Sequence, residues 1–346
     1  MSLSVEALGG AAVLYVLAFR LLNLGLMAIG TVLVWDRCRL MGWTVEQRRT
    51  ACLLFAWCPL LIMDLVGSGH NDALLLVCIL AAVWLHLRGA WPLAVAALLA
   101  GGLVKLSGFF LLPAYVVFLV RDSRSRAEAV RRIMLSLTTI MGLGSLTYLP
   151  YADPALPHAL LTNPLAGSFG PSPALALRQL LADLALALRG TLTPPDLTAR
   201  QVLAVLQWPL WNSALAIWIV PAVVFSLAVR DWEGLLRAWG RVLFSYLLIG
   251  AVWFMPWYST WLVPVLALRP GGRFRRVGLL LAWGSTLFYS ITPALPGDTT
   301  PNLRYYYVPA VIFLPPLLAC AAEWRAHRRA PTDDAAPSAP LVRQVT

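Results

Sequence analysis

Apolar segments recur along nearly the whole chain of 346 residues, and they limit its fold more than any other feature. Hydrophobic residues make up 60% of the sequence and charged residues 12%, whereas soluble domains are about half apolar and about one quarter charged. Because a helix needs about 20 apolar residues to cross a bilayer, we predict an all-α, polytopic transmembrane bundle of about eleven spans. The spans are expected at residues 9–35, 50–66, 73–87, 91–104, 107–120, 133–151, 208–229, 241–256, 258–268, 277–292 and 305–322.

Two pairs of these segments are shorter than the roughly 17 residues of a straight crossing. They are 91–104 with 107–120, and 241–256 with 258–268. Backbone that leaves the helical conformation at membrane depth must face a protein interior or a water-filled cavity. Each pair is therefore predicted to form a hairpin that enters the membrane partway, with irregular backbone beside a cavity.

Composition disfavours two classes of site. The five cysteines lie at irregular spacings without a CxxC pair, so we interpret them as small apolar packing residues rather than a metal or redox centre. The net charge of +11 would suit nucleic acid, but the basic residues lie in short loops between spans and form no basic domain. No nucleic-acid partner is predicted, and membrane lipids are the expected surroundings.

The distribution of Lys and Arg predicts the orientation of the bundle. All but six of the 27 basic residues fall in or beside loops on one side of the predicted spans. Basic residues are retained on the cytoplasmic side, so we predict a multi-pass protein of the cell membrane with its active face extracytoplasmic. The GHND turn, Lys105, the PWY turn and the loop 152–207 then face outside. The six exceptions are Arg20, Lys105, Arg178, Arg189, Arg200 and Arg304.

Residues 1–325 are predicted to form the bundle, with an outer loop at 152–207. Within this loop an apolar stretch at 174–188 carries Arg178 and Asp183, and we expect it to form an amphipathic helix along the membrane surface. Residues 326–346 are polar and rich in Pro and Ala, which is typical of a disordered tail, here on the cytoplasmic side.

The stretch LVGSGHND places His70, Asn71 and Asp72 at the start of the third span, and Asp64 lies earlier in the preceding apolar run. One interpretation is a helix cap, in which Asn71 or Asp72 accepts hydrogen bonds from free backbone N–H groups. The other is a polar active-site rim, because an ionisable residue inside a span is costly and is functional by default. Arg20, inside the first apolar run, either marks a break in its helix or pairs with Asp64.

Lys105 is the only lysine in the chain and lies between two short spans, in GGLVKLSGFF. Every other basic residue is an arginine, so the choice of a compact ammonium group here is informative. An ammonium group binds phosphate as a point charge. The alternative is a lysine that extends its charged end to the membrane interface.

Aromatic residues gather in WFMPWYSTW, where Trp257 and Tyr258 follow Pro256 at a predicted outer turn. Such residues anchor many membrane proteins at the interface. They can also line a sugar site, because aromatic faces offer apolar contact area and the Tyr hydroxyl can form a hydrogen bond. Arg304, at the outer end of the last span, either pairs with a second phosphate oxygen or lies in water.

Four strings carry a family resemblance: FAWCPLLIMDLVGSGHNDALLLVCILAAVWL, VKLSGFFLLP, SFGPSP and WFMPWYSTWLVP, in this order. Together they resemble the bacterial polyprenyl-phosphate-mannose-dependent alpha-1,6-mannosyltransferases and related integral-membrane glycosyltransferases of the GT-C class. HNDAL after a Trp-x-Pro-Leu helix is the most specific element. The lysine and PWY elements gain weight from their order.

The resemblance implies a glycosyltransferase that moves a sugar, with mannose the leading candidate, from a polyprenyl-phosphate donor. The acceptor would be a glycan or glycolipid on the outer face. A carboxylate must then remove the acceptor proton, and cations must hold the departing phosphate. The implied catalytic residues are Asp72 and Asp64, the phosphate-binding residues Lys105 and Arg304, and the substrate-binding residues His70, Asn71, Trp257 and Tyr258. No cofactor is predicted, and a requirement for a divalent metal is left open.

The chain departs from the family at its first loop. In GT-C enzymes the catalytic acid usually lies in the first outer loop, whereas the first loop here, WDRCRLMGWTVEQRRT, is basic and is predicted to be cytoplasmic. Either the chain lacks leading spans with their acidic loop, or another chain supplies the base, or Asp72 or Asp64 serves. We expect the first of these.

Two other functions suit the same features. A transporter or flippase for lipid-linked sugars would also need an outer cavity, an intramembrane carboxylate and cations for phosphate. Such a protein should show pseudo-symmetric halves with polar residues at both faces, whereas the polar residues here gather at the outer rim. A non-catalytic subunit of a cell-envelope glycan assembly would suit the missing acidic loop.

Overall fold

The computed structural model describes residues 12–154, 169–269, 271–294 and 301–329. Apart from an isolated bridge between Arg189 and Thr193, these residues form helices and turns, which confirms the predicted all-α fold. The α-helices are α2 (Ala12–Leu40), α3 (Val45–Ala56), α4 (Pro59–Leu61), α5 (Asp72–Leu87), α6 (Trp91–Val104), α7 (Leu112–Arg121), α8 (Arg126–Tyr148), α10 (Pro173–Ala187), α11 (Ala199–Leu227), α12 (Trp232–Ser245), α13 (Val263–Ala267), α14 (Arg273–Ala294) and α15 (Pro301–Arg329). Short 3-10 or π segments are η1 (Ile62–Gly67), η2 (Leu106–Leu111), η3 (Leu149–Tyr151), η4 (Tyr246–Gly250) and η5 (Pro256–Leu262).

Four of the described helices are long and apolar enough to cross a membrane. They are Val13–Leu40, Arg126–Tyr151, Ala199–Leu227 and Tyr305–Ala322, and the pair Val45–Ala56 with Pro59–Gly67, bent by 40°, forms a fifth if it counts as one span. This is fewer than the about eleven crossings predicted from a length of about 20 residues each. The reason is that several apolar segments fold as helices of only 10–17 residues, such as Asp72–Leu87 and Trp91–Val104. The molecule is a helical membrane protein with a core of short helices.

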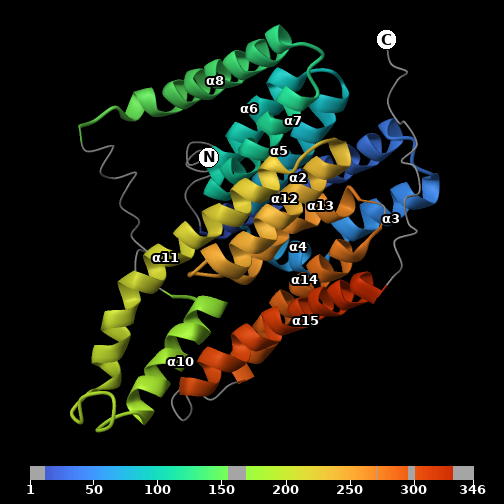
Figure 1. Ribbon diagram of the computed structural model, residues 1–346. Coiled ribbons are helices and arrows are strands. Elements are labelled where there is room, and N and C mark those ends of the chain that lie inside the picture. The colour runs from blue at the N-terminus through green and yellow to red at the C-terminus, as the bar shows by residue number, and fades with distance from the viewer. Residues whose placement is uncertain (1–11, 155–168, 270, 295–300, 330–346) are drawn as a thin grey trace.

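The short helices form the centre of the bundle (Figure 1). Helix α5 packs against α2 and α6, and α12 packs against α7, α11 and α13. The C-terminal pair α14 and α15 packs along one side, and α10 contacts both α11 and α15 away from the centre. Helix α8 contacts α6 and α7 and then extends away from the bundle (Figure 1).

The predicted outer loop contains the expected helix. Helix α10 matches the apolar stretch 174–188, because Ser172 accepts a hydrogen bond from Leu175 N–H and Pro173 occupies the first turn. The loop ends earlier than predicted, since α11 begins at Ala199 rather than at 208. Thr198 and Gln201 form a capping box there, a start signal that hydrophobicity alone does not reveal. The predicted tail also begins inside α15, which ends at Arg329, and residues 330–346 lie outside the described part of the chain.

The two predicted short pairs are interrupted helices. Helix α6 ends at Val104 and the chain continues as η2 and α7, while α12 passes into η4, an irregular stretch, η5 and α13. At the first break η2 folds back closely on α6. A Cβ atom at Gly108 would lie 2.4 Å from Gly102 N and 2.6 Å from Gly101 C, so only glycine permits this approach.

We expect Gly108→Ala to destabilise the protein by about 1–3 kcal/mol, because the added methyl group must push two backbone segments apart. Gly142→Ala in α8 is the matched control, since a Cβ there meets no heavy atom within 4 Å. The thermal unfolding midpoint of the detergent-purified protein measures both changes. Equal midpoints for the two variants would contradict the close approach of η2 to α6.

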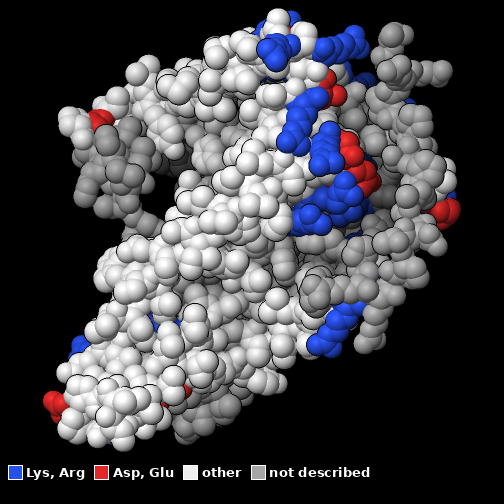
Figure 2. Space-filling view, viewed as in Figure 1, with Lys and Arg blue, Asp and Glu red and all other residues white. Residues whose placement is uncertain are grey.

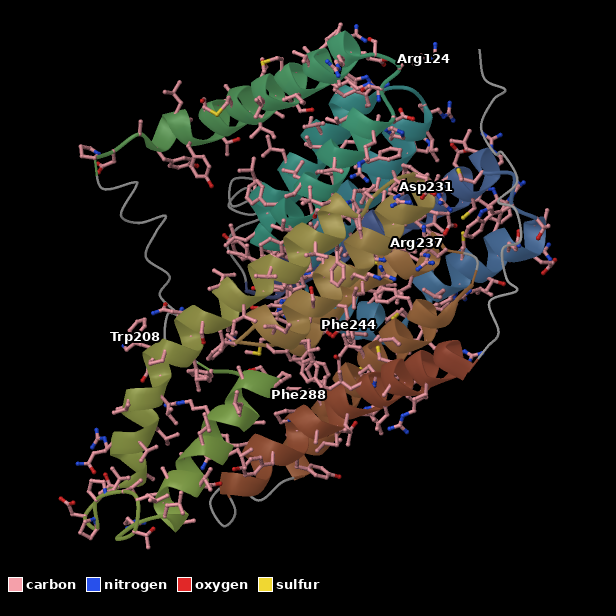
Figure 3. The ribbon with its side chains drawn as sticks, in the orientation of Figure 1. Arg124, Trp208, Asp231, Arg237, Phe244 and Phe288 are labelled. Carbon is pink, nitrogen blue, oxygen red and sulfur yellow. The ribbon has the colours of Figure 1, made fainter. Side chains whose placement is uncertain are left out.

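Charged side chains concentrate at one end of the bundle. Figure 2 shows Lys and Arg side chains with acidic partners on one side of the molecule. Arg124, Asp231 and Arg237 lie toward that side in Figure 3, whereas Trp208, near the start of α11, lies toward the other. Asp36 near the end of α2 pairs with Arg88 at 2.9 Å, and Arg132 pairs with Asp122 at 2.9 Å and Glu128 at 2.7 Å.

Candidate active site

The turn from η1 to α5 is held by a buried asparagine. Asn23 of α2 donates Nδ2–H bonds to Leu65 O at 2.7 Å and to His70 O at 3.0 Å. The His70 amide donates to Asp64 O at 3.2 Å, and Gly69 adopts a positive φ of 75°. The turn therefore has a fixed shape, because a buried amide group that satisfies two carbonyls is costly to remove. Asn23 is a residue that the sequence analysis missed, although an amide inside an apolar run was its signal.

Asp72 is completely buried, with 0% of its surface exposed, at the first position of α5. Its Oδ1 accepts a 2.7 Å hydrogen bond from Trp261 Nε1–H, and its Oδ2 lies 3.4 Å from Lys105 Nζ. Asn71, at the N-cap position, is exposed and makes no side-chain cap hydrogen bond. The capping interpretation is therefore wrong: partners on distant segments, not the helix end, hold the Asp72 carboxylate.

Lys105 lies at the break between α6 and η2, in an extended conformation with φ −145° and ψ 128°. The glycine contacts that bring η2 against α6 also turn this residue toward Asp72. Its side chain is 28% exposed, so the ammonium group contacts a buried carboxylate and still reaches open space. The ion pair with Asp72 is not expected of a lysine that only extends its charged end to the membrane interface.

Asp64 is a second buried carboxylate, 1% exposed, in η1. The Tyr289 hydroxyl of α14 donates a hydrogen bond to its Oδ1, and its Oδ2 has no hydrogen-bond partner among the described residues. Arg20 does not pair with it: Arg20 is exposed on α2, which continues without a break past this residue. Tyr289 was not foreseen, because its position on α14 gives no sequence signal toward η1.

Aromatic rings cover the polar residues. His70 stacks on Trp257 with ring centroids 4.1 Å apart, and Tyr258 stacks on Trp261 with centroids 4.6 Å apart. Burial of His70, which lies in the turn before α5, lowers its pKa, while the Asp72 carboxylate partly opposes the shift. The imidazole is therefore neutral at pH 7, and it can stack and form hydrogen bonds without adding charge.

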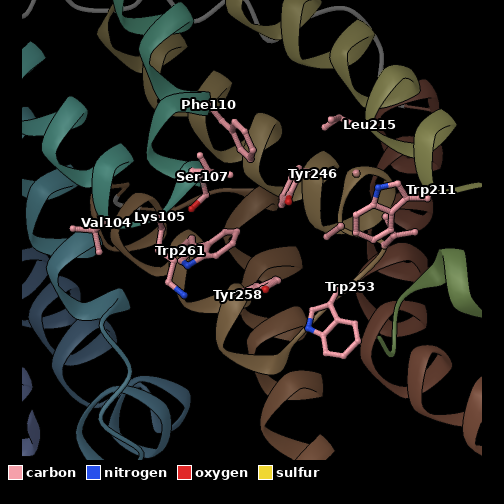
Figure 4. Close-up of a pocket in the computed structure, with 14 residues that line it drawn as sticks. Val104, Lys105, Ser107, Phe110, Trp211, Leu215, Tyr246, Trp253, Tyr258 and Trp261 are labelled. Carbon is pink, nitrogen blue, oxygen red and sulfur yellow. The ribbon is translucent and has the colours of Figure 1, made fainter. Parts of the chain in front are cut away.

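A cavity of about 480 Å³ opens beside Lys105 (Figure 4). Lys105 and Ser107 come from the α6–η2 break, Tyr258 and Trp261 from η5, and Trp211 from α11. Ser107 Oγ is buried and has no hydrogen-bond partner among the described residues. Irregular backbone at residues 250–253 also lines the cavity, as predicted for the pair of short segments 241–256 and 258–268.

The predicted site residues whose side chains are described divide into three groups. Lys105 and Tyr258 line the cavity, and Asp72 is paired with Lys105 behind its wall. His70 and Trp257 form the stacked pair next to Tyr258. Asp64 and Asn71 are not among the lining residues, and no described interaction joins either of them to Lys105. The Arg304 side chain lies outside the described part of the structure.

Within the described chain, no group of three or more His, Cys, Asp or Glu side chains is placed to hold a metal ion. Among the described residues that line the cavity, Lys105 carries a charge, and it pairs with the Asp72 carboxylate. This arrangement can hold an anion next to apolar and aromatic surface.

Fold and site together define a helical membrane protein in which a buried carboxylate pairs with a partly exposed lysine at an aromatic-lined cavity. Residues 1–121 match the family model described as alpha-(1->6)-mannopyranosyltransferase, N-terminal domain. The match confirms the resemblance inferred from the sequence and supports an alpha-mannosyltransferase, and it includes Asp64, His70, Asp72 and Lys105. No curated protein and no solved structure matches the chain.

Proposed function

We propose that the protein transfers mannose from a polyprenyl-phosphate donor to a glycan or lipid-linked acceptor at the extracytoplasmic face of the cell membrane. The observation that carries this proposal is the position of Lys105. Its ammonium group stands on the wall of a cavity of about 480 Å³ and is held from behind by the buried Asp72 carboxylate. The match of residues 1–121 to a mannosyltransferase domain supports the choice of reaction.

The proposed reaction breaks one bond to the sugar, forms another in its place and moves one proton. The bond between the anomeric carbon and the phosphate oxygen breaks, and its electron pair leaves with the polyprenyl phosphate. The acceptor hydroxyl oxygen bonds to the same carbon, and its proton passes to the departing phosphate or to water. Negative charge grows on the departing phosphate, and a fixed cation at that point stabilises the transition state more than the ground state. Lys105 is the group placed for this role, since it is the basic residue among the described residues that line the cavity.

Asp72 is a positioning residue in this proposal. A carboxylate that is 0% exposed, hydrogen-bonded to Trp261 through Oδ1 and ion-paired with Lys105 through Oδ2 at 3.4 Å, orients the ammonium group. A pre-oriented cation does not have to reorganise as charge develops, which is the main advantage of an enzyme site over water. The role of acceptor base would require Asp72 or Asp64 to reach the cavity, and both are buried outside its lining.

The remaining lining suits a lipid-linked sugar. Tyr258, Trp253 and Trp261 offer aromatic faces for the sugar ring, and Ser107 offers an unpaired hydroxyl for a hydrogen bond. Phe110 and Leu215 provide apolar surface for an isoprenoid chain. The excess of basic residues at the opposite end of the bundle favours an extracytoplasmic position for this cavity.

Reconstituted vesicles distinguish transfer from transport. Vesicles that contain the purified full chain are given radiolabelled polyprenyl-phosphate mannose and a lipid extract that supplies acceptors. We expect the label to appear in a product that survives mild acid, because a glycosidic bond has replaced the acid-labile phosphate linkage. If the donor crosses the vesicle bilayer while no new glycosidic bond forms, the protein is a flippase and the proposal is wrong.

A further inference from the structure

A second cavity lies at the end of the bundle opposite the Asp72–Lys105 pair. Helix α5 has Asp72 at one end, and at its other end Trp84 Nε1–H donates to Asp36 Oδ2 at 2.7 Å. Asp36 lies near the C-terminal end of α2, which ends at Leu40. Trp43 follows shortly after this helix end, so it lies at the same end of the bundle, away from Asp72. Here a cavity of about 150 Å³ is enclosed by the start of α3, the end of α13 and the start of α14.

One partly buried guanidinium group lines this cavity, and a fully buried one lies behind the lining. Arg269 lines it with 14% of its side chain exposed, and its Nε has no hydrogen-bond partner among the described residues. Arg37 lies behind Trp43, another lining residue, with its Cζ 5.0 Å from the indole centroid. Arg37 is 2% exposed, and neither its Nε nor its Nη1 has a partner in the described part of the chain.

The nearby carboxylates pair only weakly with these two arginines. Glu233 Oε2 is 3.9 Å from Arg269 Nη2, which is at the limit of an ion pair, and Glu233 is 56% exposed. Glu46 lines the cavity but pairs with the exposed Arg49 at 3.0 Å. Buried charges are normally paired and their N–H groups satisfied, because an isolated buried charge is costly. An anion in the cavity would supply an acceptor for Arg269 and would place negative charge near Arg37.

We propose that this cavity binds a phosphate group, which approaches from the polar surface and bonds to Arg269 above the Trp43–Arg37 stack. Guanidinium forks suit phosphate oxygens, and basic pockets between membrane helices are known sites for anionic headgroups. The volume of about 150 Å³ is several times the roughly 30 Å³ that one water occupies, so a tetrahedral anion fits. The source is either an anionic lipid headgroup or free phosphate, and this site is independent of sugar transfer.

The test uses the purified full chain in nanodiscs. One arm adds inorganic phosphate to nanodiscs of phosphatidylcholine, and the other replaces part of the phosphatidylcholine with phosphatidylglycerol. We expect the thermal midpoint to rise in at least one arm. A rise with inorganic phosphate assigns the site to free phosphate, and a rise with phosphatidylglycerol alone assigns it to a lipid headgroup.

Variants separate the pocket from general surface charge. Arg269→Gln should bind phosphate or headgroup roughly tenfold more weakly, since it loses charge-assisted hydrogen bonds. Arg124→Gln removes the same charge from the connection between α7 and α8 and should bind as the wild type does. Arg269→Lys, which keeps the charge without the fork, should be intermediate and guards against misfolding of the Gln variant. No rise in either arm for the wild type, or equal weakening by Arg124→Gln, overturns the proposal.

Discussion

Replacing Lys105 with alanine should lower the rate of mannose transfer roughly 100- to 1,000-fold, the usual effect of removing one charge-stabilising group from an active site. The ammonium group is the cation on the cavity wall, so its loss leaves the departing phosphate without a fixed counter-charge. Initial rates with radiolabelled polyprenyl-phosphate mannose, at equal amounts of protein in the vesicles, measure the change. Leu93→Ala in α6 is the control, because this side chain is 58% exposed and lies outside the cavity lining, so it should tolerate truncation.

A loss of activity in Lys105→Ala could also reflect unfolding, because Asp72 would be left buried without its cation. An unsatisfied buried polar group costs about 1–3 kcal/mol. The double variant Lys105→Ala with Asp72→Asn removes both charges, so we expect it to regain most of the thermal stability and none of the transfer. Wild-type transfer in Lys105→Ala, or full transfer in the double variant, would show that Lys105 does not hold the phosphate.

Sequence reasoning selected the candidate site residues through chemistry that is visible one residue at a time. Lys105 stands out as the only lysine, and Asp72 and Asp64 stand out as carboxylates in or beside apolar runs. Sorting loops by their arginines then placed Lys105 and the GHND turn on the same side of the membrane, and the contact between Lys105 and Asp72 agrees with that placement. The all-α fold followed from composition for the same reason, since only helices or closed barrels can span a bilayer.

Pairings between distant segments could not be predicted in this way. Asp72 could have capped its own helix, but Trp261 and Lys105 hold it instead, and nothing local to any of the three residues specifies this choice. Asn23 and Tyr289 gained their roles from the packing of α2 and α14 against the η1 turn. Fewer helices are long enough to cross a membrane than the about eleven predicted spans, because an apolar run does not show whether it folds as one long helix or as a helix of only 10–17 residues.

Asp72→Asn should lower kcat roughly 10- to 100-fold, because a cation displaced by even about 1 Å loses much of its effect on the transition state. The Asn side-chain oxygen can still accept the Trp261 Nε1–H bond, which spans 2.7 Å in the native protein, so the aromatic wall should stay in place. The amide N–H₂ group, however, cannot accept a bond from Lys105, and the freed ammonium group carries its full charge into the cavity. The donor should therefore bind at least as tightly, with KM unchanged or lower.

The split between kcat and KM distinguishes a positioning role from a merely structural one. Trp261→Phe removes the hydrogen bond to Asp72 Oδ1 and keeps an aromatic ring, so we expect a loss in kcat smaller than that of Asp72→Asn while the Lys105 ion pair remains. A structural defect would lower the thermal midpoint and reduce the amount of active enzyme in both variants without a change in KM. If Asp72→Asn raises KM while kcat is unchanged, the carboxylate contributes to donor binding and does not orient Lys105 for the chemical step.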